Sequence, residues 1–335
     1  MVKILKKLLG PINRRFKLKS QIELAYNYWI DFLLYRKYSI AFHVEDLKNK
    51  EAELILNYHG IEKGFLHNNI KAGFAKDRII KLHRLLSDSE IIENINRSQI
   101  RVAFQVMCEY FELQKKYGYN ISNFYTEAQY NSYRSTLDSL YNENESGVIE
   151  WTDSEFYSRV DSNFESFAFS RKSIRNFTGE KIPDNILSSA IQLANTAPSV
   201  CNRQASNVYL VENKSKIDKI LNIQGGFKGY TANVNQLLIL TNDRRYYYTN
   251  GERNQLYIDG GIYLMNLLYA LHFNKIANCP IHWGKTIQQE KALNGIIAIP
   301  EAEKVICMIP IGISQKEFKT TLSLRRNFFE NFFKL

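Results

Sequence analysis

The sequence predicts a mixed α and β protein with a helical N-terminal extension. Residues 21–140 show helical spacing of apolar side chains and contain no proline. Helical patterns and short strands alternate from residue 161 onward, and the stretch 141–160 between the two parts is polar and acidic. We therefore expect one domain over residues 1–160 and a second over 161–335.

The composition is that of a globular protein, with 45% hydrophobic and 23% charged residues in 335 positions. The four cysteines have neither a paired nor a metal-ligand spacing, so we expect no metal site. No apolar run reaches the roughly 18 residues that cross a bilayer, and the N-terminus does not resemble a secretory signal. The cytoplasm is therefore the simplest compartment.

Positive charge is concentrated at the N-terminus. Residues 1–20 hold seven Lys and Arg and no acid, which leaves about +3 (+10 minus +7) for the rest of the chain. A body so close to neutral argues against a nucleic-acid partner. Apolar residues alternate with the lysines until Gly10-Pro11. Two interpretations stay open: a solvated terminus, or peripheral contact with an anionic membrane at its inner face.

Several elements can be placed in order along the chain. Helical spacing covers residues 21–42, 76–86 and 90–117. Pro183 and Asp184 suit the start of a helix that should end before Pro198. Residues 258–273 form a helix that is apolar on nearly all sides, which indicates burial. Strands are expected over 207–211, 236–241, 276–281 and 305–313.

A dense polar cluster, His59 to Gly64, stands inside the helical extension. One interpretation is a helix terminus closed by Gly64, with the charges of Glu62 and Lys63 in solvent. The other is a site element, because helical spacing places His59 and Glu62 on one face. The residues alone leave both open.

A basic cluster begins the second domain. Arg171, Ser173 and Arg175 occupy every second position, so an extended backbone would place all three on one face. Two guanidiniums beside a hydroxyl suit a phosphate, since Arg forms bidentate, charge-assisted bonds. The alternative is a solvated basic strand edge.

A polar loop, Ser199 to Gln204, follows the helix that starts near Pro183. Its hydroxyl and amide groups can bind the donor and acceptor edge of a planar heterocycle. The two clusters together favour a ligand that has both a phosphate and a heterocycle.

The order of these motifs resembles the FMN-dependent nitroreductase family. Ile258 to Gly261, Cys279 to Trp283 and Arg325 to Glu330 add to the resemblance, which covers residues 161–335. The chain is similar to long members associated with polysaccharide biosynthesis, which also carry a helical N-terminal half with a segment like His59 to Gly64. The resemblance implies an α+β fold, an antiparallel sheet flanked by helices, and a homodimer with FMN at its interface.

The resemblance also implies roles for individual residues. Arg171, Lys172 and Ser173 would hold the FMN phosphate, and Arg175 would lie at the pyrimidine edge of the ring. The partner subunit would supply the loop residues Pro198, Ser199, Asn202 and Gln204. Backbone groups of Pro280, Ile281 and Trp283 would face N5 and O4, and Arg325 and Arg326 would return to the phosphate. His282 would donate a proton near N5 or only hydrogen-bond a carbonyl.

The implied activity is hydride transfer from NAD(P)H through flavin N5 to an unidentified small-molecule acceptor. The sequence lacks the Gly-x-Gly-x-x-Gly fingerprint of a separate nicotinamide site. Reductant and acceptor would therefore visit the flavin in turn. The alternative is a redox-inactive, flavin-binding interaction protein of a glycan-assembly complex.

Overall fold

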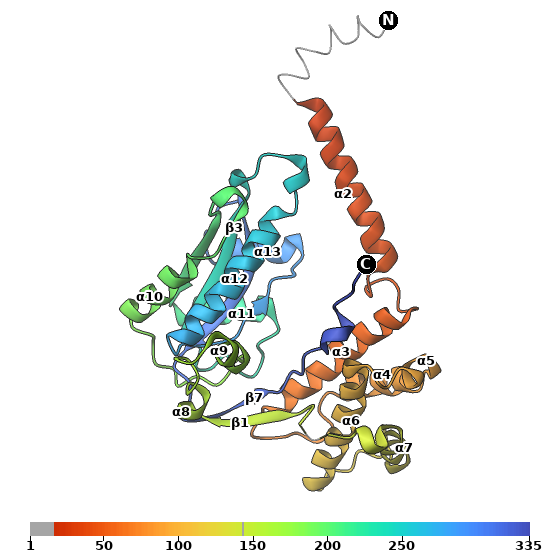
Figure 1. Ribbon diagram of the computed structural model, residues 1–335. Helices are drawn as coiled ribbons and strands as arrows, with labels where there is room; N and C mark the ends of the chain where they lie inside the picture. The colour runs from red at the N-terminus through yellow and green to blue at the C-terminus, as the bar shows by residue number, and fades with distance from the viewer. Residues whose placement is uncertain (1–16, 143) are drawn as a thin grey trace, which may run out of the picture. The chain divides into compact units, whose positions relative to one another are not determined.

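The computed structural model describes residues 17–142 and 144–335, which belong to two compact units (Figure 1). The sheet unit comprises residues 150–320 together with the described residues up to Leu24, and the helical unit comprises 25–149 and 321–335. The chain thus changes unit near residue 150 and again near 321, whereas the sequence suggested one change at 160. Strand β1 (Val148–Thr152) pairs with β7 (Glu317–Thr321), so the two crossings lie side by side.

The sheet unit is built on a five-stranded sheet in which every pairing is antiparallel. Its strands are β2 (Ser206–Val211), β3 (Gln236–Asp243), β4 (Ala277–Asn278), β5 (Ile281–His282) and β6 (Glu303–Gly312). The order is β2-β3-β6-β4, with β5 also paired to β6. This confirms the predicted α+β class with an antiparallel sheet and a helical N-terminal region.

Helices flank both faces of the sheet. The side chains of β3 point alternately to the two faces, where they pack into two separate hydrophobic cores. Leu238 and Leu240 pack with α10 (Asp184–Ala194) and α12 (Gln255–Phe273). Leu237 and Ile239 pack with α11 (Lys214–Gln224) and α13 (Ile287–Asn294). The short helices α8 (Asp153–Phe156) and α9 (Phe164–Ser170) precede the sheet in the chain.

Two sequence predictions in this unit need correction. Helix α12 is not buried on nearly all sides, since Tyr257, Ile258, Ile262 and Met265 are exposed. The predicted strand 276–281 is divided into β4 and β5 around Pro280, which has no N–H to donate to a ladder. Helix α11 was not predicted at all.

The helical unit contains six α-helices within the described residues, with α2 beginning in the sheet unit. They are α2 (Leu18–Tyr38), α3 (Leu47–Phe65), α4 (Lys76–Leu86), α5 (Ser89–Glu93), α6 (Ser98–Lys116) and α7 (Glu127–Leu137). The single helix predicted over 90–117 is therefore two, with a break at 94–97. Helix α6 is the most buried of them and packs with α3, α4 and α7. Short 3-10 turns cover 138–140, 200–202, 244–246, 250–252 and 328–330.

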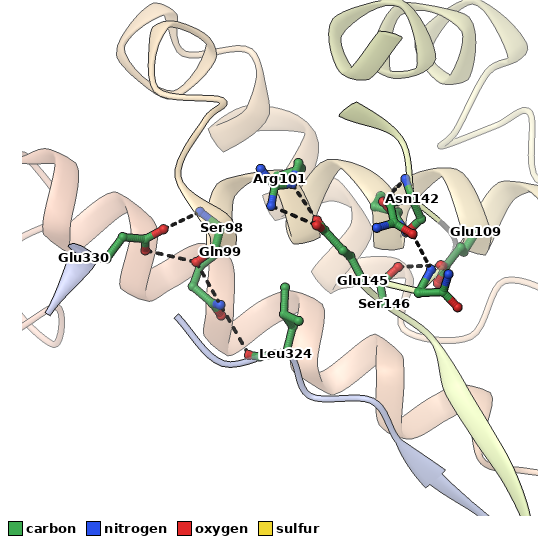
Figure 2. A network of polar contacts seen from close by, with 11 residues as sticks. Ser98, Gln99, Arg101, Glu109, Asn142, Glu145, Ser146, Leu324 and Glu330 are labelled. Carbon is green, nitrogen blue, oxygen red and sulfur yellow. Dashed lines mark hydrogen bonds and ion pairs between the residues drawn. The ribbon is translucent and has the colours of Figure 1, made fainter. Parts of the chain in front are cut away.

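Polar contacts tie two distant segments to α6, as Figure 2 shows. The backbone N–H and the hydroxyl of Ser98 donate to the Glu330 carboxylate at 2.8 and 3.0 Å. Arg101 forms a two-pronged ion pair with Glu145, and the Ser146 hydroxyl donates to Glu109. These bonds explain why the C-terminal residues belong to the helical unit.

Helix α2 buries none of its side chains, and its exposed residues include Trp29, Phe32 and Tyr35. Within residues 17–142 and 144–335, no helix combines the length and the apolar character needed to cross a bilayer. Most of the basic N-terminal stretch, residues 1–16, lies outside the described residues, so its predicted membrane contact stays a prediction.

Candidate ligand-binding site

The basic segment, residues 170–177, follows α9 and runs beside the sheet. The Ile174 N–H donates to the Asn278 carbonyl at 2.9 Å, and Phe177 bridges to Ser314. Ile174 and Phe177 anchor the segment in the core. The sequence predicted that Arg171 and Arg175 would share one face of an extended segment. In the structure they differ in exposure, since Arg175 is buried and Arg171 is half-buried.

Arg175 is the residue of this segment best suited to bind a ligand. It is 9% exposed, and its buried Nη1 has no hydrogen-bond partner among the described residues. It lies near Tyr230: burial raises the pKa of Tyr230 to about 12, while the Arg175 charge acts in the opposite direction. A buried N–H donor without an acceptor is costly, so this atom is suited to an acceptor supplied by a ligand.

The segment Pro280 to Trp283 lies on the same part of the sheet as the basic segment. Ile281 and His282 form β5 opposite Met308 and Cys307, and Gln224 Nε2 donates to the His282 carbonyl at 3.0 Å. The His282 side chain is exposed, whereas Trp283 is buried in the core with its Nε1 unpaired among the described residues. The Ile174 bond to Asn278 places the basic segment next to β4, two residues before Pro280.

His272, which sequence reasoning missed, lies beside the start of the basic segment. Its Nε2 is 2.8 Å from the Ser170 hydroxyl. Burial, with a smaller contribution from the Arg171 charge, lowers the pKa of His272 to about 4. The imidazole is therefore neutral at pH 7. A single histidine inside an apolar helix gives no sequence signal that it will contact the start of the basic segment.

The polar loop has an unusual backbone. Cys201, Asn202 and Gln204 have φ angles of 48°, 55° and 51°, in the left-handed region that side chains rarely adopt. The Ser199 hydroxyl accepts the Gln204 N–H at 2.9 Å. Strained residues of this kind persist only where their surroundings hold them, and they cluster at functional sites.

Asp259 anchors the polar loop from the first turns of α12. Its carboxylate is 3% exposed and accepts the Val200 N–H at 3.3 Å, the Tyr247 hydroxyl at 3.2 Å and Gln255 Nε2 at 2.8 Å. A pocket of about 190 Å³ opens between loop and helix. It is lined by Asn195, Ala197, Pro198, Ser199, Gln204, Ser206, Asp259 and Tyr263. Asn202 does not line it.

The two clusters lie at opposite ends of α12. The basic segment begins beside His272 and the polar loop lies beside Asp259, which are 13 residues apart in the helix. At 1.5 Å per residue this is roughly 20 Å. Within one chain, the structure therefore does not bring the loop residues together with Arg171 and Arg175.

Arg325 and Arg326 lie in the helical unit. Arg326 Nη2 donates to the Glu51 carboxylate at 3.0 Å, and Arg97 donates to the same group at 2.7 and 3.1 Å. Arg325 donates to the Ser323 carbonyl at 2.7 Å. Their role at a phosphate stays a prediction.

The cluster His59 to Gly64 forms the C-terminal end of helix α3, as one interpretation predicted, but the Glu62 charge is not in solvent. Helix α3 continues through Gly64 to Phe65, and Glu62 is fully buried. His59 Nδ1 lies 3.0 Å from the Glu62 carboxylate. Glycine is required at 64, since a Cβ there would lie 2.2 Å from the ring of Phe74. The segment therefore allows α3 to pack closely against Phe74, and it places the Glu62 carboxylate inside the helical unit.

Known proteins resemble about half of this chain or less. Residues 168–227 match the family model described as "Nitroreductase family". A structure from Staphylococcus epidermidis, described as an NAD(P)H:FMN oxidoreductase, is 18% identical over 52% of this chain and 96% of its own, with a TM-score of 0.46. A nitroreductase-like protein from Streptococcus mutans is 18% identical over 52% and 98%, with a TM-score of 0.45.

A third structure is a nitroreductase in complex with FMN from Desulfovibrio desulfuricans. It is 20% identical over 52% of this chain and 98% of its own, with a TM-score of 0.44. A comparison with curated proteins found no match. The family match covers the basic segment and the polar loop, the two stretches that carry most of the predicted site residues.

Proposed function

We propose that the protein is an FMN-dependent oxidoreductase that uses NAD(P)H. The observation that carries the proposal is Arg175, a buried guanidinium with an unpaired Nη1 inside the stretch that matches the nitroreductase family model. An unpaired donor at this depth fits the acceptor-rich pyrimidine edge of a flavin. The motif of the basic segment supports the same cofactor.

Each part of the candidate site has a proposed role. Arg171, Lys172 and Ser173 would hold the phosphate, and Arg175 would lie at the pyrimidine edge. FMN supplies a carrier that accepts a hydride at N5 from NAD(P)H and passes it to an acceptor. A cation at the pyrimidine edge favours the negative charge of reduced flavin. The exposed His282 would hold a proton for the acceptor, which remains an unidentified small molecule.

A homodimer is part of the proposal. The basic segment and the polar loop lie roughly 20 Å apart along α12 in one chain, so the loop would serve the flavin site of a partner. The exposed side chains Tyr257, Ile258, Ile262 and Met265 give α12 an apolar surface for such a partner. Closed two-fold dimers are also the commonest assemblies.

The cofactor is tested by titrating the purified chain with FMN. At 100 times its dissociation constant, FMN should stabilise the fold by about 2.7 kcal/mol, seen as a rise in melting temperature. Arg175→Ala should weaken FMN binding, while Arg84→Ala, an exposed arginine of the helical unit, should not. A wild-type chain that neither binds FMN nor melts later in its presence would refute the proposal.

Activity is tested by anaerobic stopped-flow reduction with NADH or NADPH, followed by a panel of acceptors. Reduction at a useful rate supports the oxidoreductase. FMN binding without reduction would instead support the redox-inactive interaction protein.

The shared site is tested by subunit complementation. Arg175→Ala and Gln204→Ala would each damage both sites of a homodimer. A mixed dimer would carry both defects in one site and none in the other, so random mixing should restore about a quarter of the wild-type activity. No restoration between chains shown to exchange would contradict the arrangement.

We also propose that the protein is cytoplasmic, that it acts in polysaccharide biosynthesis, and that residues 1–20 contact an anionic membrane at its inner face. The supporting observations are the +7 charge of this stretch and the exposed aromatic residues of α2 that follow it. Anionic liposomes should pellet the full chain more than a chain starting at Gln21. Equal pelleting of the two, or pelleting indifferent to salt, would refute it.

A further inference from the structure

The polar loop is held by a side chain that belongs to it but does not line the pocket. Arg203 forms a two-pronged ion pair with Glu252, with Nη2 to Oε1 at 2.8 Å and Nη1 to Oε2 at 3.0 Å. The side chains are 17% and 15% exposed, so solvent screens the pair only partly. Arg203 does not line the pocket.

Further contacts of Arg203 join the polar loop to residues 246–252. We call the Arg203–Glu252 pair and these contacts the clasp. Arg203 Nε donates to the Val200 carbonyl at 3.2 Å, within the loop, and Nη1 donates to the Tyr246 carbonyl at 2.6 Å. The guanidinium also lies 5.2 Å and 5.4 Å from the ring centroids of Tyr247 and Tyr248. Nearly all donors of the fork are therefore used inside the protein.

The conformation that the clasp holds is costly. Cys201 and Asn202, directly before Arg203, and Gln204, directly after it, have left-handed φ angles. Each left-handed residue other than glycine costs of order 1 kcal/mol or more, so a free loop would relax to other conformations. On the other side, the one contact of Asp259 with a described residue of the loop is the bond from the Val200 N–H.

We propose that Arg203 is a positioning residue: its clasp to Glu252 holds the polar loop in the conformation that presents Ser199 and Gln204 to a ligand in the pocket. The inference rests on the proposed function for the identity of that ligand, FMN. Its physical content is preorganisation, because a loop that is already ordered does not lose conformational freedom on binding.

The test combines two readouts on the same variants, Arg203→Gln, Glu252→Gln and the double variant. FMN affinity should fall by about tenfold or more in each. The second readout is the reaction of Cys201 with a thiol reagent, which needs no flavin. Cys201 is exposed while Cys108, Cys279 and Cys307 are buried, so the fast-reacting thiol reports the loop. Its rate should change several-fold in all three variants.

Controls separate the clasp from other effects. Arg245→Gln breaks a similar two-pronged pair, with Asp243, that does not involve the loop, and should leave both readouts unchanged. Because Arg203 and Glu252 act through each other, the double variant should be no worse than either single one. Circular dichroism on Glu252→Gln, which leaves the loop sequence intact, guards against misfolding.

The outcomes are distinct. Wild-type affinity and a wild-type Cys201 rate in Arg203→Gln and Glu252→Gln would overturn the inference. Loss of FMN binding in Arg203→Gln alone would also overturn it, because Arg203 would then act on the ligand directly. A wild-type chain that binds no FMN refutes the proposed function, while the Cys201 rates still decide whether the clasp orders the loop.

Discussion

Two neighbouring glycines near the start of α12 should respond in opposite ways to the same substitution. An added Cβ at Gly260 would lie 2.8 Å from Ile306 Cγ1 and 3.0 Å from its Cδ1, on strand β6. At Gly261 a Cβ would meet nothing within 4 Å. Both residues lie inside the helix, so their intrinsic preferences should be nearly equal.

The magnitudes follow from two terms. Replacing glycine by alanine inside a helix gains about 1 kcal/mol at either position. Overpacking a well-filled contact costs about 1–3 kcal/mol, and only Gly260→Ala has that cost. We therefore expect Gly261→Ala to stabilise by about 1 kcal/mol and Gly260→Ala to be neutral or destabilising by up to about 2 kcal/mol. Their difference, about 1–3 kcal/mol, does not depend on helix propensity.

The assay is thermal and urea unfolding of the flavin-free chain at low concentration. Each kcal/mol should move the melting temperature by about 2–4 °C for a unit of this size. Ile306→Ala supplies the control, since Gly260→Ala should lose its penalty in that background. Equal effects of the two alanines, or an unchanged penalty in Ile306→Ala, would refute the claim that close packing of α12 on β6 requires Gly260.

Three other predictions concern buried ionisable side chains. In Glu51→Gln, Arg97 and Arg326 lose their buried counterion, so the helical unit should lose about 3 kcal/mol in urea unfolding followed by circular dichroism. Burial lowers the pKa of His272 to about 4, so the neutral form stabilises the sheet unit above pH 6.5 and this stability is lost as the pH falls toward 4. In His272→Gln, unfolding followed by tryptophan fluorescence should show a smaller loss of stability over the same pH range. Burial raises the pKa of Glu109 to about 7, so its contribution is full below pH 4.5 and lost as the pH rises through 7; Glu109→Gln should therefore compare more favourably with wild type at pH 8 than at pH 5, and equal differences at both would contradict this.

Much of the fold could be predicted because its signals are local. Helix α10 begins and ends where Pro183 and Pro198 imply, and α4 covers the predicted residues 76–86. Strands β2, β3 and β6 were placed within three residues at each end. These elements carry uninterrupted patterns, and tertiary packing agrees with them.

The remainder depended on contacts between distant residues. No local pattern shows that 321–335 returns to the helical unit, because the Glu330 bonds to Ser98 join positions 232 apart in the chain. The exposed side of α12 has the same residue types as its buried side, so the sequence could not reveal it. The break between α5 and α6 falls where no proline or glycine marks it.

The candidate site was predicted as a set of residue types but not as an arrangement. The basic segment and the polar loop were recognised from spacing and chemistry, yet their positions at opposite ends of α12 follow only from the bonds of Ser170 and Val200. Arg203 was inside the recognised loop and had no assigned role. Its proposed role depends on the carboxylate of Glu252, which is 49 residues away in the sequence and lies beside Arg203 only in the folded chain.

Arg326 has a predicted role at a phosphate and an observed bond to a buried carboxylate. Arg326 was expected at a phosphate, and in the structure it neutralises the buried Glu51 together with Arg97. Arg326 gives Glu51 one bond, from Nη2, and a phosphate bond would draw the same side chain toward a second anion. If Arg326 also binds the phosphate, Glu51→Gln should release it and tighten FMN binding, and Arg326→Ala should weaken binding. If Arg326 only completes the helical unit, both variants should lower its stability and leave the FMN dissociation constant unchanged. The bonds of Glu51 favour the second outcome, because a fully buried carboxylate that loses either partner loses more free energy than an exposed phosphate contact returns.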